Sequence, residues 1–216
     1  MICGNLVKSK SMISKQTLLI AAVFIVLTSC KQALMKKYGV SKPQIESLES
    51  VRKSINGYSR GYDSCLCVFR DSSALVDWFR NTGLPGRSLF FNSSGYRIIT
   101  QDSAFCSGVE TEFAGNLRPG LALRIDSLTH FEKLRKSIYP IGEKVKLDPA
   151  LYDYTCVIFW AKFLGRINEA SFAIAASAMS SNAGRTGKVN FIFVCMDIMN
   201  FWGVSGDMIR TNTGIR

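Results

Sequence analysis

Two short apolar runs with an alanine-rich stretch between them restrict the folds open to this chain more than any other feature. Residues 155–160 (TCVIFW) and 189–196 (VNFIFVCM) are rich in aromatic and β-branched side chains, which predicts two buried strands. Residues 168–181 predict a helix, and the polar loop at 182–187 ends it. Strand, helix and strand in this order are typical of a parallel pair of strands, so we expect an α/β fold.

The middle of the chain predicts further strands and helices. Residues 65–69 form an apolar run typical of a strand, and Asp71 with the two serines after it predicts the N-cap of a helix. Residues 88–91 and 96–100, with a turn between them, predict a β-hairpin. Apolar residues make up 47% of the chain, which is enough for a packed core around these elements. The remaining predicted elements are a helix over 108–117, a strand over 121–125 and a helix over 126–136.

The N-terminal region has the composition of an export signal. Residues 18–27 (LLIAAVFIVL) are uninterrupted apolar residues, preceded by three lysines and followed by small residues. A run this short does not cross a bilayer core, which takes about 20 residues, but it matches the apolar part of a signal peptide. Met1 and Met12 are both candidate starts, because residues 1–11 add little to the signal. An uncleaved signal anchor is the alternative interpretation.

The end of this region resembles the lipobox of bacterial lipoproteins. Residues 27–30 read Leu-Thr-Ser-Cys, and with Lys31 next they are similar to lipoproteins of the Bacteroides group. The resemblance implies cleavage before Cys30, diacylglycerol on the Cys30 thiol and acylation of the new amino terminus with a palmitate-type chain. Two or three acyl chains anchor a protein stably where one does not. We therefore expect a bacterial cell-envelope protein held in the inner or outer membrane, with its domain in the periplasm.

These features divide the chain into an export signal, a tether and a domain. We expect a signal peptide over 1–29, a tether or surface helix over 30–57 and an α/β domain over 58–205. Within the domain, the ranges 58–117, 118–150 and 151–205 form two structured parts and the connector between them, and residues 206–216 form a frayed tail.

The formal net charge of +11 comes from cations scattered along the chain, without a run of five or six. This pattern is typical of a solvated basic surface. Nucleic acid is not an expected partner, because export across the membrane removes most such targets. The expected partners are the membrane, through the lipid anchor, and an unidentified envelope protein.

The first strand and helix resemble the active-site strand and helix of a thioredoxin. The strand ends in a matching segment at Trp160, and the second strand ends in an Asp, as it does in the family. Where the family has Cys-Gly-Pro-Cys, this chain has Leu164, Gly165, Arg166 and Ile167. Thiol–disulfide exchange needs one thiol to attack and another to resolve. The resemblance therefore implies a site that is chemically dead; the alternative is that Leu164 and Ile167 are ordinary core residues.

The second half of a thioredoxin does not fit after this unit, but a similar layout precedes it. Residues 83–85 (GLP), ending at Pro85, resemble the Gly-Ile-Pro segment of the family, and residues 89–98 resemble its β-hairpin. The resemblance implies a thioredoxin-like mixed sheet flanked by helices, with the two halves in swapped order. Two incomplete thioredoxin-like units are the alternative.

The remaining cysteines define the redox alternative. Cys106 lies in a polar stretch and is the candidate for a reactive or disulfide-bonded thiol. Cys65, Cys67, Cys156 and Cys195 lie in apolar segments, where a thiol behaves as a small hydrophobe.

The single histidine, His130, makes a His-based metal site a weak hypothesis, and no phosphate loop is present. We expect no metal and no cofactor. Two functions remain: a membrane-anchored, non-catalytic binding or assembly scaffold, or an envelope thiol–disulfide oxidoreductase that uses displaced cysteines such as Cys106 with Cys156.

Overall fold

A computed structural model of the chain describes residues 35–58, 61–82, 88–99, 107–117, 123–182 and 188–204. The chain divides into two units, Met1–Tyr38 and Gly39–Arg216. In the first unit only residues 35–38 are described, and they are helical. The second unit contains the sheet, its helices and the candidate site.

The centre of the second unit is a seven-stranded sheet with the order β5-β4-β3-β7-β8-β2-β6. β7 (Tyr154–Trp160) and β8 (Val189–Cys195) pair in parallel along their whole length, which confirms the parallel pair predicted from their apolar sequences. β2 (Leu66–Phe69) adds in parallel on the other side of β8. The carboxyl ends of these three strands therefore meet at one edge of the sheet.

The predicted hairpin forms the other half of the sheet. β3 (Ser88–Asn92) and β4 (Tyr96–Ile98) are antiparallel, and β3 also pairs with β7, antiparallel. The two chain segments with thioredoxin resemblance thus lie next to each other in one sheet. Two short strands, β1 (Ile45–Glu46) and β9 (Ile198–Met199), make a separate parallel pair.

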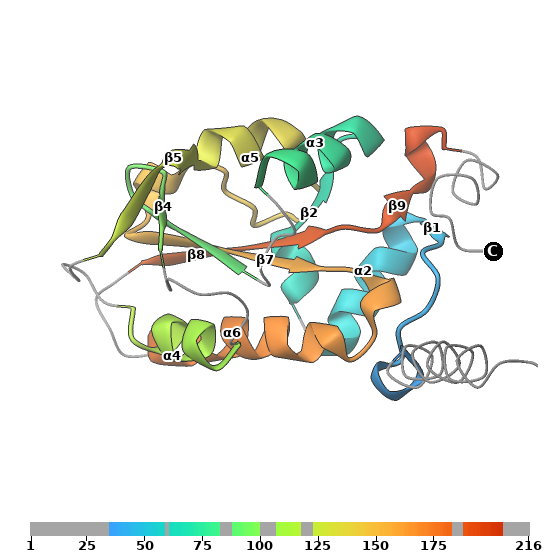
Figure 1. Cartoon of the computed structure of the whole chain (residues 1–216), viewed down its shortest axis with the longest axis horizontal. Helices are drawn as coiled ribbons and strands as arrows, with labels where there is room; N and C mark the ends of the chain where they lie inside the picture. Colours follow the sequence, from blue (N-terminus) through green and yellow to red (C-terminus); the bar gives the residue numbers. More distant parts are fainter. Residues whose placement is uncertain are drawn as a thin grey trace, which may run out of the picture. The chain divides into compact units, whose positions relative to one another are not determined.

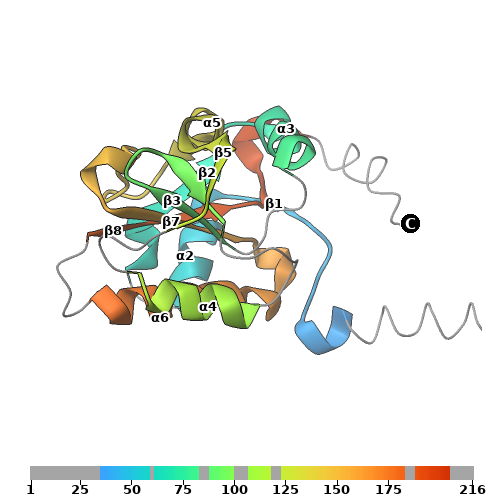
Figure 2. The same cartoon turned by 60° about the vertical axis from the view of Figure 1, so that its left-hand side comes forward.

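Helices cover both faces of the sheet, and this layering confirms the coarse prediction of an α/β fold with a mixed sheet flanked by helices. Figures 1 and 2 show α3 (Ser72–Thr82) and α5 (Phe131–Ser137) on one face, with α4 (Ser107–Gly115) and α6 (Ile167–Asn182) on the other. α2 (Leu48–Tyr58) packs on the face of α6, with Val51 and Ile55 fully buried.

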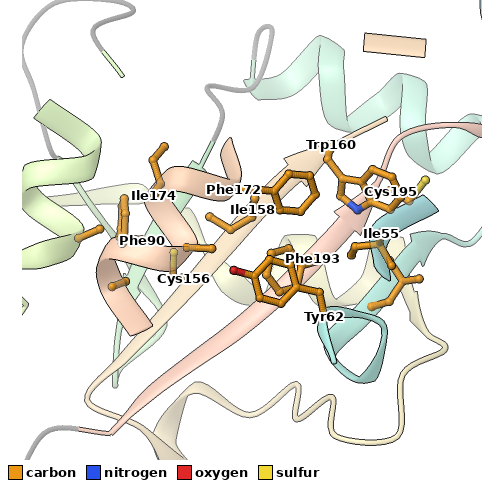
Figure 3. Close-up of a cluster of buried hydrophobic side chains, with 14 of the residues drawn as sticks. Ile55, Tyr62, Phe90, Cys156, Ile158, Trp160, Phe172, Ile174, Phe193 and Cys195 are labelled. Carbon is orange, nitrogen blue, oxygen red and sulfur yellow. The ribbon is translucent and has the colours of Figure 1, made fainter. Parts of the chain in front are cut away.

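Successive side chains of β7 point to opposite faces of the sheet and belong to two apolar clusters. Ile158 and Trp160 point into the cluster on the α6 side, whereas Val157 and Phe159 point toward α3 and α5. The first cluster, drawn in Figure 3, combines aliphatic and aromatic side chains, and the rings of Tyr62 and Phe193 stack with their centres 4.4 Å apart. Each fully buried side chain of this size contributes about 1.5–3 kcal/mol.

The predicted boundary between the strand at 121–125 and the helix at 126–136 is wrong. β5 runs over Ile125–His130 and α5 begins only at Phe131. Asp126 does not cap the helix, because its Oδ1 accepts the Leu128 N–H (2.9 Å) in a local turn. His130 caps α5 instead, its Nδ1 accepting the Glu132 N–H (3.2 Å), so the structure gives this histidine a structural role.

The helix start predicted after β2 is confirmed. Asp71 Oδ1 accepts the Ala74 N–H (2.7 Å) at the beginning of α3. β6 (Ile138–Pro140), which forms one edge of the sheet, was not predicted, because it has three residues and ends in a proline. Four 3-10 turns complete the described chain: η1 (Tyr62–Cys65), η2 (Pro149–Leu151), η3 (Lys162–Leu164) and η4 (Asn200–Trp202).

Candidate functional site

The resemblance to thioredoxins places the candidate site where β7 passes into α6, at residues 161–168, which we name the β7–α6 junction. The chain leaves β7 through Ala161, makes the turn η3 and enters α6 at Ile167. Gly165 has φ 52° and ψ −129°, a conformation that side-chain-bearing residues rarely adopt. The backbone itself therefore requires glycine here, whether or not the site ever carried redox chemistry.

A buried asparagine fixes the junction. Asn168 is 1% exposed, and its amide forms a two-way bridge to Ala161: Oδ1 accepts the Ala161 N–H (3.2 Å) and Nδ2 donates to the Ala161 carbonyl (2.7 Å). Nδ2 also donates to the Tyr58 hydroxyl (3.2 Å), which in turn donates to the Gly165 carbonyl (3.3 Å). Asn168 thus satisfies the Ala161 N–H and adds a second hydrogen bond to the Ala161 carbonyl, which also accepts the Leu164 N–H (3.1 Å).

A buried carboxylate that follows β8 holds the start of η3 in the junction. Asp197, 1% exposed, accepts the Lys162 N–H (2.7 Å) and the Cys195 thiol (3.2 Å) through Oδ2. Burial raises the pKa of the Asp197 carboxyl, and hydrogen bonds from the Lys162 backbone and Cys195 oppose that rise. Burial, reinforced by the nearby Asp197 charge, raises the pKa of the Cys195 thiol well above its ordinary value. Cys195 is therefore held as a neutral thiol.

An ion pair ties the N-terminal part of the domain to the same junction. Lys162 Nζ lies 2.5 Å from Glu46 Oε2 and donates to Ser50 Oγ (2.7 Å), and Ser50 Oγ donates to Glu46 (2.8 Å). Glu46 is 8% exposed, so its charge depends on these two partners.

The segment at residues 40–46 also reaches the junction through its backbone. The Ser41 N–H donates to the Phe163 carbonyl (2.9 Å), and β1 then pairs with β9, which begins directly after Asp197. In a thioredoxin-like interpretation, the chain's own N-terminal segment contacts the loop that would present the redox residues.

The described site residues lie close together in the sequence, at the end of β7 and the start of α6. Trp160 is fully buried, Leu164, Gly165 and Ile167 are half-buried, and Arg166 is exposed. Leu164 and Ile167 therefore lie at the strand-to-helix turn and not deep in the core.

Three predicted residues, Cys30, Pro85 and Cys106, lie outside the described part of the chain. Of the described thiols, Cys65, Cys67 and Cys195 form no disulfide. Burial, with a smaller contribution from Cys65, raises the pKa of Cys67 to about 12. Cys156, named in the redox alternative, is fully buried in the cluster on the α6 side. Cys67, Cys156 and Cys195 are fully buried and therefore lack the exposure that a nucleophilic thiol needs.

Sequence reasoning missed Glu46, Ser50 and Asn168, and it found no partner for Asp197. A signal for Asp197 existed, since a polar residue directly after a buried parallel strand lies beside the end of the neighbouring strand. No comparable signal exists for Glu46, which is 116 residues away from Lys162.

Among the described residues, no group of three or more His, Cys, Asp or Glu side chains could hold a metal ion. The helices in the described part of the chain include none that is long and apolar enough to cross a membrane. Comparison of the chain with protein-family models, curated proteins and solved structures finds no match.

Proposed function

We propose that this chain is a lipid-anchored protein of a bacterial cell envelope whose thioredoxin-like domain binds or assembles other molecules without catalysing thiol–disulfide exchange. The anchor is supported by the signal-like apolar run and by the Leu-Thr-Ser-Cys segment ending at Cys30. The membrane, inner or outer, and an envelope protein are the proposed partners.

The swapped-half thioredoxin-like arrangement is supported by the neighbours in the sheet. A single domain built from both halves needs them in one sheet, and the β3–β4 hairpin pairs directly with β7. α6 follows β7 and connects it to the parallel strand β8, as the family resemblance of this segment implies.

The proposal that the domain does not catalyse thiol–disulfide exchange is supported mainly by the chemistry of the β7–α6 junction. Leu164 and Ile167 occupy the two positions where the family has thiols. The thiol nearest in the hydrogen-bond network, Cys195, is fully buried and donates to Asp197, which suppresses its ionisation. A binding role is what remains for a structured domain without a nucleophile at this position.

Metabolic labelling with an alkyne-tagged palmitate in a bacterial host tests the anchor. The full chain should carry label, and Cys30→Ser should lose both the label and its place in the membrane fraction. Cys3→Ser is the matched control and should keep both. Label that persists in Cys30→Ser would disprove the lipobox interpretation.

Restoring the two thiols tests the proposed correspondence with the redox site. In the double variant Leu164→Cys with Ile167→Cys, the first thiol should have a pKa at least about one unit below the ordinary 8.5, because the N-terminus of α6 stabilises the thiolate. The control pair Ala173→Cys with Ala176→Cys has the same spacing in the middle of α6 and should show no such lowering. Equal pKa values in both pairs would contradict the proposed correspondence between residues 164 and 167 and the thioredoxin cysteines.

A further inference from the structure

A second surface at the same edge of the sheet has the character of a binding groove. It is lined by Leu48, Arg70, Tyr139 and Phe201 and has a volume of about 430 Å³. Ligand sites in proteins commonly measure about 300–1,000 Å³. None of the described residues that line it belongs to the β7–α6 junction.

The carboxyl end of β2, the antiparallel strand β6, the turn η4 and the start of α2 build this groove. Arg70 is the first residue after β2, and Tyr139 lies on β6 opposite Val68. Phe201 lies in η4, which is held over the end of β2 because Trp202 Nε1–H donates to the Phe69 carbonyl (3.2 Å). Ligands of α/β proteins bind preferentially outside the carboxyl ends of parallel strands, which is where this groove lies.

The apolar side chains of the groove are unusually exposed. Tyr139 is 52% exposed and Phe201 is 50% exposed, while Leu48 packs against the cluster on the α6 side. Large aromatic side chains gathered at an exposed site mark an interaction surface more often than chance. Because the two rings extend into solvent, the groove is open and accessible to a chain segment of a partner.

The charge of the groove is positive. The Arg70 guanidinium is exposed and makes no ion pair with any described residue. Its neighbour Asp71 accepts the Ser73 hydroxyl (2.6 Å) and the Ala74 N–H (2.7 Å), and these hydrogen bonds lower the pKa of Asp71 more than the charge of Arg70 does. A second guanidinium, that of Arg52, donates to the Ile141 carbonyl directly after β6 (2.5 Å). An acidic group on a partner would complement these charges.

Strand addition to β6 is not how a partner could bind here. The backbones of Ser137 and Ile141 pair with β2, so by the alternation of an antiparallel ladder Tyr139 also faces β2. The Ile138 N–H donates to the Leu134 carbonyl, and Pro140 has no N–H. The outer edge of β6 therefore offers no backbone donor, and recognition must use side chains.

We propose that this groove binds a segment of a protein partner in which a carboxylate stands beside an aromatic or aliphatic side chain. The carboxylate pairs with Arg70, and the apolar side chain packs against Tyr139, Phe201 and Leu48. This names the partner chemistry for the binding role proposed above and rests on that role. It does not depend on the lipid anchor.

The test is a binding assay with the full chain in mild detergent and an array of synthetic heptapeptides. One set places Glu beside Phe, Trp, Leu or Ile; two matched sets carry Gln or Lys in place of Glu. We expect the Glu set to bind. The affinity of the Gln set should be lower by a factor of about ten or more. Arg70→Glu should reverse the preference toward the Lys set. Arg80→Glu, the same charge change on α3, should not.

The apolar contact has its own control. Phe201→Ser should weaken binding of the Glu set about tenfold, whereas Leu151→Ser, a similarly exposed side chain elsewhere, should leave it unchanged. Unaltered thermal unfolding of each variant excludes a folding defect. The inference is overturned if no peptide binds, if the Gln set binds as tightly as the Glu set, or if binding is indifferent to Arg70→Glu. If the chain is labelled with palmitate but does not bind the peptides as described, the proposed anchor stands and the proposed groove is rejected.

Discussion

Two strand-to-helix junctions lie at the same edge of the sheet and differ in almost every physical respect. At the β7–α6 junction, Asn168, Asp197 and the Glu46–Lys162 ion pair satisfy the backbone and one another. Where β2 passes into α3, Arg70 faces solvent without an ion pair among the described residues, beside two half-exposed rings. One junction is closed by the molecule's own groups, and the other is open to a partner.

This difference shows that the position with the family resemblance is not the position with a surface free to bind a partner. The resemblance directs attention to Leu164 and Ile167, but Lys162, Asn168 and Asp197 beside them are already paired within the chain. Closed polar networks of this kind are costly to break and contribute rigidity. The groove beside β2 has the unpaired charge and exposed apolar area that binding requires, although nothing in the local sequence resembles a motif.

The largest effect should come from the buried asparagine. Asn168→Leu leaves the buried Ala161 N–H without a partner, whereas the Ala161 carbonyl keeps the Leu164 N–H (3.1 Å), and the change should cost about 1–3 kcal/mol of unfolding free energy. Urea denaturation of the variant measures this loss. The control is Asn116→Leu, whose amide donates to an exposed helix carbonyl and should change stability little. A loss below about 0.5 kcal/mol for Asn168→Leu would mean that the junction is not closed by this bridge.

The next effect compares the two cations that follow the parallel strands. Lys162→Met leaves the nearly buried Glu46 carboxylate with only the Ser50 hydroxyl, and should cost about 1–3 kcal/mol. Arg70→Met removes an exposed charge that has no ion-pair partner and should stay within about 0.5 kcal/mol. Equal losses in the two variants, measured by chemical denaturation, would erase the distinction between the junctions.

The smallest effect is a difference in pH dependence between two aspartates, one at each junction. Burial raises the pKa of Asp197 above its ordinary 3.8, so the folded protein binds that proton more tightly than the unfolded chain. The stabilisation from protonated Asp197 is present below pH 3.8 and is lost as pH rises through the folded-state pKa. Asp197→Asn cannot ionise and should remove this decline.

Asp71 should behave in the opposite sense. Hydrogen bonds from Ser73 and Ala74 lower the pKa of Asp71, so its contribution is present above 3.8 and is lost as pH falls through the folded-state pKa. Unfolding free energies measured from pH 3 to 7 for Asp197→Asn and Asp71→Asn should therefore deviate from those of the parent chain with opposite slopes. Slopes of the same sign would contradict the burial of Asp197.

Elements with strong local signals could be predicted from the sequence. β7 and β8 are long apolar runs, and Asp71 caps α3 through contacts within three residues. β6 was missed because a three-residue strand ending in Pro140 has no periodicity to read. The start of α5 was misplaced because Asp126 is a preferred N-cap residue and His130 is not, whereas the pairing of β5 with β4 keeps residues 125–130 in a strand.

The site was harder to predict than the fold, because distant segments build it. Glu46 and Lys162 meet across 116 residues, and no local pattern connects them. The groove likewise combines Leu48, Arg70, Tyr139 and Phe201 from four parts of the chain. Only Asp197, which directly follows a buried parallel strand, had a position that sequence reasoning could have placed correctly.

The most direct test of the account makes one charge change at each junction. Arg70→Glu and Arg166→Glu both reverse an exposed guanidinium, the first beside the groove and the second at the β7–α6 junction. Titration of the full chain with the tightest-binding Glu-containing heptapeptide should show binding lost in Arg70→Glu and kept in Arg166→Glu. Binding lost in Arg166→Glu and kept in Arg70→Glu would place the working surface at the thioredoxin-like position and contradict the account.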